Sequence, residues 1–131
     1  MPSLNGVGGR VHPVGIVRPH GLGRYLKADA SLIVMDCEGG EFALLDPAND
    51  PVLFRTNIVV EIHGEFGDAH EIIRKFANTH NITEITPSVR GASNILVEPI
   101  RGIDMLSAAD ERRGHQTWLF LEVNTQDVSK H

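Results

Sequence analysis

Four short apolar runs, separated by polar and glycine-rich segments, set the pattern of the chain. Ser31 to Met35 and Asn57 to Ile62 are continuous runs of strand length, which is typical of strands covered on both faces in a parallel sheet. Ile82 to Ile85 and Thr117 to Val123 are also apolar and β-branched enough to predict strands. All four runs are far shorter than the ~20 residues that a membrane-spanning helix requires. The pattern therefore predicts a sheet and no segment that spans a bilayer.

A further strand and a short helix are predicted nearer the N-terminus. Arg10 to Val17 places four apolar residues around Pro13, and because proline cannot donate to a central ladder, we expect a short or edge strand there. His20 to Lys27 has the composition of a short helix, although Gly21 and Gly23 weaken it. With these segments the predicted sheet has five strands.

Two more helices are expected between the strands. Glu41 to Leu45 has helical composition, and Asp46-Pro47 follows it as a stop signal. Asp68 is suited to cap a helix that ends near His80. The apolar stripe of this second helix consists of Ile72, Ile73, Phe76 and Ala77. We also expect a loop over Ser88 to Asn94 and a loop with a short helix over Ile103 to Arg113.

The alternation of strand and helix predicts an α/β fold. Right-handed crossovers between parallel strands place helices on the faces of the sheet. The 131 residues fit one domain, and 41% hydrophobic with 22% charged residues is ordinary globular composition. We therefore expect residues 1–131 to form a single layered α/β domain.

Charge and cysteine content exclude some function classes. Twelve Lys and Arg residues against seventeen Asp and Glu residues give a net charge of −5, which argues against a general binder of nucleic acid or of anionic membranes. The single cysteine, Cys37, cannot form an internal disulfide, and no secretion signal is recognised, so we expect a cytoplasmic protein. Cys37 lies between two acidic residues that disfavour its thiolate, which predicts a small buried side chain rather than a nucleophile.

Polar side chains follow the two strongest predicted strands where each strand ends. Asp36, Cys37 and Glu38 leave the first, and Glu61 and His63 close the second. If the strands are parallel neighbours, their carboxyl ends lie about 5 Å apart. Ligands of α/β sheets bind outside these ends. We therefore expect the acidic and imidazole groups to converge on one rim.

Several roles are open for this group of side chains. His63 is the strongest candidate for a catalytic base, because imidazole titrates near neutral pH, and Asp36 or Glu61 would assist it. Asp36 could also accept a hydrogen bond from a cofactor or cap the next helix, and Glu38 is open between function and structure. Asp36, Glu61 and His63 together offer oxygen and nitrogen ligands for a divalent cation, as in a metal-dependent hydrolase. Glu41 is interpreted as a structural residue that complements the helix dipole.

A family resemblance adds to this interpretation. The stretches "LIVMDCEGGEFALLDP", "NIVVEIH" and "WLFLEV" resemble the C-terminal half of class I S-adenosylmethionine-dependent methyltransferases, FkbM-type group. In that group a strand ending in Asp-x-Glu-Gly-x-Glu is recurrent, matched here by Asp36, Glu38, Gly39 and Glu41. The similarity extends from about Leu4 to Val123.

The resemblance implies a partial Rossmann-like sheet with strands equivalent to three to seven of the family. Its implied activity is methyl transfer from S-adenosylmethionine to a small-molecule hydroxyl or similar nucleophile. Asp36 and Glu38 would then lie on the cofactor side of the cleft, and His63, Asp36 and Glu61 would be catalytic. A divalent metal is a possible second cofactor.

The chain departs from the family pattern in its cofactor-binding part. The glycine-rich loop and the acidic ribose-binding residue of the family have no counterpart, so we expect a truncated domain without the N-terminal cofactor-binding strands. The fourth strand of the family sheet would then have an unpaired edge, which invites another chain. The expected partner at this edge is a missing half or a second copy in a homodimer. The alternative function is a noncatalytic binding or oligomerisation module derived from the same fold.

Overall fold

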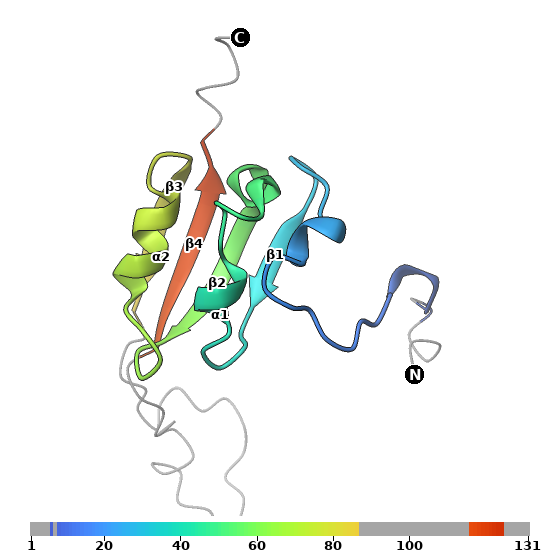
Figure 1. Ribbon diagram of the computed structural model, residues 1–131, viewed down its shortest axis with the longest axis horizontal. Coiled ribbons are helices and arrows are strands. Elements are labelled where there is room, and N and C mark those ends of the chain that lie inside the picture. The colour runs from blue at the N-terminus through green and yellow to red at the C-terminus, as the bar shows by residue number, and fades with distance from the viewer. Residues whose placement is uncertain (1–5, 7, 87–115, 125–131) are drawn as a thin grey trace, which may run out of the picture.

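The computed structural model describes residue 6, residues 8–86 and residues 116–124. Four strands form one open sheet in the order β1-β2-β4-β3 (Figure 1). They are β1 (Leu32–Met35), β2 (Asn57–His63), β3 (His80–Ile85) and β4 (Gln116–Val123). β1 is parallel to β2, whereas β4 is antiparallel to both β2 and β3. The structure therefore confirms the α/β class and four of the predicted strands.

The helices are short and two of them were predicted. They are α1 (Glu41–Leu44), α2 (Ala69–Phe76) and the 3-10 turns η2 (Gly8–Arg10), η3 (Leu22–Arg24) and η4 (Pro51–Arg55). In Figure 1, α1 and α2 lie over the same side of the sheet. Asp68 caps α2 as expected, because its carboxylate accepts a hydrogen bond of 2.9 Å from the backbone N–H of His70.

The hydrophobic core lies between the sheet and this helical layer. Alternate residues of β2 and β4 point into it, and Ile72 and Phe76 of α2 are completely buried against them. The sheet residues of the core are Ile33, Met35, Ile58, Val60, Ile62, Leu119 and Leu121. The period of two selects one face of β1 and of the first half of β2 for burial, whereas Glu61 and His63 at the end of β2 are buried as well.

The other face of β1 is open, which corrects one prediction. Leu32 is 58% exposed and Val34 is 69% exposed. Ile33 and Met35, which alternate with them along the strand, are each 7% exposed. The expectation that this strand is covered on both faces is wrong. The reason is that the helices in the described part of the chain pack on one face, so the second apolar row of β1 receives no cover from them.

The N-terminal predictions are also corrected. No strand forms over Arg10 to Val17: the turn η2 ends at Arg10, and the residues after it have no regular structure. Ile16 is 80% exposed there. Among the described residues, no strand lies beside this segment to pair with it. The segment that the resemblance equates with strand three of the family therefore forms no strand. Of the helix expected over His20 to Lys27, only the turn η3 forms. The segments expected over 88–94 and 103–113 lie outside the described residues.

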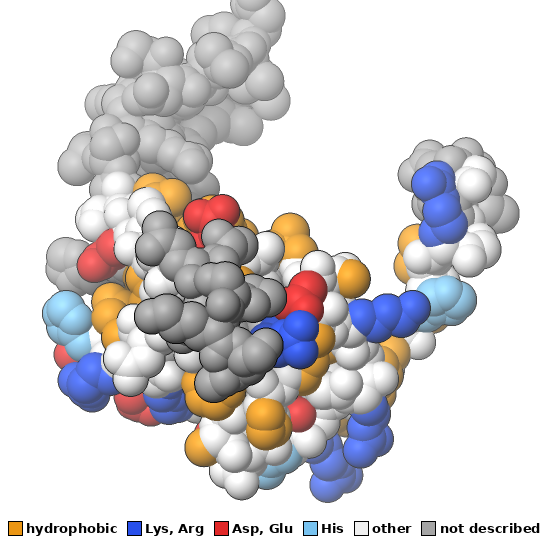
Figure 2. All heavy atoms as spheres, turned by 90° about the horizontal axis from the view of Figure 1, so that it is seen from above, with side chains coloured by type: hydrophobic (Ala, Val, Ile, Leu, Met, Phe, Trp, Pro, Cys, Tyr) orange, Lys and Arg blue, Asp and Glu red, His pale blue; other side chains and the backbone are white. Residues whose placement is uncertain are grey.

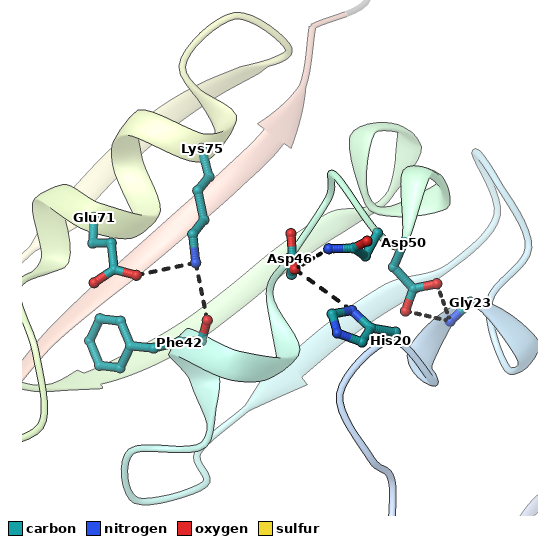
Figure 3. Close-up of polar contacts among 8 residues, drawn as sticks. His20, Gly23, Phe42, Asp46, Asp50, Glu71 and Lys75 are labelled. Carbon is teal, nitrogen blue, oxygen red and sulfur yellow. Dashed lines mark hydrogen bonds and ion pairs between the residues drawn. The ribbon is translucent and has the colours of Figure 1, made fainter.

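Polar contacts connect the helices and turns of this layer to one another (Figure 3). The Lys75 ammonium of α2 donates to the carbonyl oxygen of Phe42 in α1 at 3.0 Å and pairs with Glu71 at 3.3 Å. The backbone N–H of Gly23 lies 3.2 Å from both carboxylate oxygens of Asp50. A side chain at Gly23 would collide with Asp50. These contacts join α2 to α1 and the turn η3 to the loop that precedes η4.

The surface of the described residues carries charges of both signs. In the view of Figure 2, acidic and basic side chains are interspersed on the left, whereas basic side chains predominate on the right. No helix within the described ranges combines the length and the apolar character needed to cross a membrane.

Candidate functional site

The loop between β1 and α1 has an unusual backbone. Glu38 has φ of 51° and Gly39 has φ of 98°, so two consecutive residues take left-handed conformations. Such values are costly for a residue with a side chain. A Cβ atom at Gly39 would also approach the Phe66 ring to 2.7 Å. The tight turn reverses the chain directly after β1 and delivers three carboxylates around the end of the strand.

Asp36 and Glu38 meet His63 at the carboxyl ends of β1 and β2. Nε2 of His63 lies 3.6 Å from Oδ1 of Asp36 and 3.9 Å from Oε2 of Glu38. The two strands are parallel neighbours, with Met35 opposite Val60. The expected convergence of acidic and imidazole groups on one rim of the sheet is therefore confirmed.

Glu41 lies beneath the rim and holds the imidazole. Its carboxylate is completely buried and accepts hydrogen bonds from the backbone N–H of Gly39 at 2.9 Å and from the thiol of Cys37 at 3.4 Å. Nδ1 of His63 lies 3.4 Å from the same carboxylate. Burial alone raises the pKa of Glu41, but a hydrogen bond from its own backbone N–H, together with these three hydrogen bonds, outweighs burial and lowers the pKa, which keeps the group ionised.

The interpretation of Glu41 as a helix-dipole residue missed this role. The signal was present in the sequence, because Glu41 is the third carboxylate of the Asp-x-Glu-Gly-x-Glu motif. A buried carboxylate at the start of a helix needs specific donors, and two of them come from its own preceding loop. His63, from the next strand, is the third.

His63 is the most distinctive side chain of the site. Its side chain is 5% exposed, and the Nδ1 hydrogen is donated to Glu41 in the tautomer that this contact favours. Among buried side-chain nitrogen and oxygen atoms of the described residues, Nε2 of His63 lacks a hydrogen-bond partner. Burial lowers its pKa, but the hydrogen bond that the ring donates to Glu41 and the charges of Glu38, Glu41 and Glu61 outweigh burial, so the pKa of His63 is raised. The result is a fixed ring with one nitrogen facing the two rim carboxylates.

Glu61 takes a different place from the one expected in a metal triad. It is 5% exposed and lies within β2 opposite Trp118, two residues before the strand end. Two residues of a strand span about 7 Å, which sets Glu61 back from the rim. Within the described residues, the cluster whose ligand atoms lie within 4.8 Å of one another consists of Asp36, Glu38 and His63. Glu38 therefore replaces Glu61 in the observed group, because the left-handed turn brings it over His63.

Cys37 is only partly buried, whereas the sequence predicted a buried side chain, but its thiol is as unreactive as expected. Burial, the hydrogen bond to Glu41 and the charges of Glu41 and Asp36 raise the pKa of the thiol to about 11. A thiol with this pKa is almost fully protonated at neutral pH and is a poor nucleophile. Its role is to donate to Glu41 and to pack against the core.

Comparison of the chain with models of protein families, with curated proteins and with solved structures found no significant match. The chemistry of the site therefore has to be argued from its geometry. A fixed, buried imidazole nitrogen beside two exposed carboxylates can accept a proton from a bound molecule or contribute to a cation site.

Proposed function

We propose that the chain is an S-adenosylmethionine-dependent methyltransferase-like domain that acts on a hydroxyl or similar nucleophile of a small molecule. One observation carries the proposal: the unpartnered Nε2 of His63 faces Asp36 and Glu38 outside the carboxyl ends of two parallel strands. This is where ligands of α/β sheets bind. His63 is the proposed base, and Asp36 and Glu38 form the proposed cofactor side.

The strand arrangement supports the proposal. A methyltransferase sheet of this class has strands four and five as parallel neighbours, with strand seven antiparallel between strands five and six. β1, β2, β3 and β4 have the corresponding order and directions if they are strands four, five, six and seven. The numbering is the one that the resemblance implies for these four segments.

The proposed mechanism assigns a role to each side chain of the rim. Methyl transfer is an in-line displacement in which positioning supplies most of the acceleration, and S-adenosylmethionine supplies an electrophilic methyl group on a positively charged sulfur. Nε2 of His63 takes the proton of the acceptor hydroxyl, a contribution of typically ~10²–10⁴-fold in rate. Glu41 positions the ring through Nδ1 and stabilises the imidazolium that forms. Asp36 and Glu38, both exposed, provide negative charge for the cationic donor.

The proposal includes a second polypeptide half. The glycine-rich loop and the acidic ribose-binding residue of the family have no counterpart in this sequence, so donor binding by the chain alone is expected to be weak. β1 pairs only with β2 among the described residues, and the other edge of β1 is the proposed docking position of the missing strands.

Titration of the ¹⁵N-labelled chain with S-adenosylmethionine, followed by amide chemical shifts, tests the donor side. Saturable shifts are expected at residues 36–40, and S-adenosylhomocysteine, which lacks the positive charge, should bind more weakly. Asp36→Asn should weaken donor binding by about tenfold, because a contact to a charged group is worth about 1.5–3 kcal/mol and solvent screening at this exposed carboxylate reduces it to the lower end. Glu65→Gln, at an exposed position, is the control. Absence of saturable shifts at millimolar donor would overturn the proposal.

A second candidate function is favoured by the open face of β1. Leu32 and Val34 expose apolar side chains on the edge strand, as expected of a noncatalytic binding or oligomerisation module. In that case the rim carboxylates would have no catalytic task. Sedimentation of a Val34 variant, described in the Discussion, tests this candidate separately from donor binding.

A further inference from the structure

We infer that Asp36, Glu38 and His63 form a binding site for a first-row divalent metal ion, with Mn²⁺ and Zn²⁺ as the ions that suit it. One ligand atom from each residue lies within 4.8 Å of the other two. The inference concerns an ion on these three side chains and stands whether or not the chain transfers methyl groups.

The separations between the three groups fit a shared ion better than direct hydrogen bonds. Nε2 of His63 is 3.6 Å from Asp36 and 3.9 Å from Glu38, beyond the 2.7–3.2 Å of ordinary N–H···O hydrogen bonds. Two ligand atoms that each lie about 2.1 Å from one ion are roughly 3.0–3.4 Å apart. Asp36 and Glu38 have exposed side chains, so small rotations bring their oxygens the remaining few tenths of an ångström inward.

The buried nitrogen is the observation that distinguishes this group from an ordinary acidic cluster. Nε2 of His63 is unpartnered although the side chain is 95% buried, and burying a polar atom without a partner is unfavourable. In the tautomer set by Glu41, the lone pair of Nε2 points toward two negative charges. A cation placed between the nitrogen and the carboxylates satisfies all three groups at once.

Glu41 contacts the ring nitrogen of His63 that does not face the proposed ion. Metal-binding histidines commonly donate their other ring N–H to a carboxylate, which fixes the tautomer and the ring orientation. The contact between Nδ1 of His63 and the buried Glu41 has this form, at 3.4 Å. Glu41 is itself held by Gly39 and Cys37, so the imidazole is oriented before an ion arrives.

The donor set and the exposure of the site indicate the kind of ion. Two carboxylates and one imidazole are mixed oxygen and nitrogen ligands, which favour Mn²⁺, Fe²⁺ or Zn²⁺ over Mg²⁺ or Ca²⁺. Three protein ligands, two of them exposed, leave coordination positions for water or for a bound molecule. With an ion bound, His63 serves as a ligand rather than as a proton acceptor, and the ion lowers the pKa of a coordinated hydroxyl.

Titration of the full chain with Mn²⁺, followed by electron paramagnetic resonance, tests the inference without any methyl donor. We expect a saturable site with one Mn²⁺ per chain, and pulsed measurements should detect coupling to an imidazole nitrogen that disappears in His63→Gln. Asp36→Asn and Glu38→Gln should each weaken binding at least tenfold, and both substitutions together should abolish it. Calorimetric titration with Zn²⁺ should give the same order of variants.

The controls separate this site from surface binding and from the methyltransferase proposal. His70→Gln, at an exposed histidine, should bind Mn²⁺ like the wild-type chain. Glu38→Gln keeps the shape of an exposed side chain, so loss of the ion there does not reflect unfolding, which circular dichroism will confirm. Equal binding by the Asp36→Asn/Glu38→Gln double variant and the wild-type chain, or no saturable site with either ion, would overturn the inference. Neither result depends on binding of S-adenosylmethionine.

Discussion

Gly39 is the residue of the rim whose replacement is most constrained. Its φ of 98° is unfavourable for a side chain, and an added Cβ would meet the Phe66 ring at 2.7 Å. We predict that Gly39→Ala lowers the free energy of unfolding by about 1–3 kcal/mol, because the strained backbone and the collision act together. Gly15→Ala is the matched control, since nothing lies within 4 Å of a Cβ there. Urea unfolding of the two variants measures the difference, and equal midpoints would contradict the prediction.

His80 gives the chain a pH-dependent stability away from the rim. The ring is buried at the start of β3, its Nε2 lies 3.0 Å from the carbonyl oxygen of Thr56, and its Nδ1 lies 2.8 Å from the hydroxyl of Thr79. The Phe76 ring meets it edge to face. Burial lowers the pKa of His80, and the hydrogen bond to Thr56 offsets this only in part. The folded chain therefore holds His80 neutral.

The sign of the pH effect follows from this lowered pKa. As the pH falls through about 6.5, the unfolded chain binds a proton at His80 before the folded chain does, so the free energy of unfolding decreases. The stabilising contribution of neutral His80 to the free energy of unfolding is fully present above that pH and is lost below it. His80→Gln retains a side-chain N–H for Thr56 but does not titrate. We predict that the wild-type chain loses more stability than His80→Gln in urea unfolding when the pH is lowered from about 7 to about 5. Parallel pH curves would contradict this.

At the level of elements, α2 is anchored by a narrow apolar stripe. Ile72 is completely buried, Ile73 is partly buried and Arg74 is exposed, as the helical period requires. We predict that Ile72→Ala lowers the free energy of unfolding by about 2–5 kcal/mol, because it removes buried methyl groups and leaves a cavity. Arg74→Ala should stay within about 0.5 kcal/mol of the wild-type chain. The free energy of unfolding of Ile73→Ala, measured by chemical denaturation, should lie between those of the other two variants. A larger decrease for Ile73→Ala than for Ile72→Ala would contradict the prediction.

Elements with strong local signals were predictable from the sequence. The run that forms β2 and the Asp68 cap carry their information within a few residues. The apolar stripe was predicted in part: α2 ends at Phe76 instead of near His80, and Ala77, which the prediction included, is exposed. Arg10 to Val17 also has a strand-like pattern, but a strand needs a neighbour, and local pattern does not say whether one exists. For the same reason the pattern of β1 could not reveal that Leu32 and Val34 lack cover.

The candidate site was predictable in its location and only partly in its members. Strand ends placed Asp36 and His63 together, because the carboxyl ends of parallel neighbours share a rim. The choice of Glu38 over Glu61 depended on two left-handed residues, and nothing in the pattern of hydrophobic residues specifies that turn. The role of Glu41 depends on its burial and on its contact with His63 of β2. Both are tertiary effects that the local sequence does not specify.

At the level of the whole molecule, the described helices cover one face of the sheet. The described helices lie over the core face, and the edge strand β1 exposes Leu32 and Val34 on the other face. Edge strands with exposed apolar residues tend to pair with other chains, and a lysine on such a strand opposes pairing. The edge of β1 that is unpaired among the described residues, beside these exposed side chains, is therefore where the proposed partner half or second copy would bind.

Val34→Lys tests this expectation. We predict that the wild-type chain self-associates as its concentration is raised and that Val34→Lys shifts it toward monomer by severalfold, because the charge has to be desolvated in a pair. Ile16→Lys is the control, since Ile16 is 80% exposed but lies outside the sheet. Sedimentation over a range of concentrations measures the change. A strictly monomeric wild-type chain, or equal effects of the two substitutions, would contradict the prediction.

The position of β4 has a consequence for how the protein is made. β4 joins β2 to β3 although it is the last of the described strands along the chain, and β3 pairs only with β4 among the described residues. A nascent chain emerging from the ribosome cannot assemble this sheet until Val123 has cleared the exit tunnel. Until then β3 has no described strand to pair with, so a chaperone that shields its backbone during translation would act on this segment first.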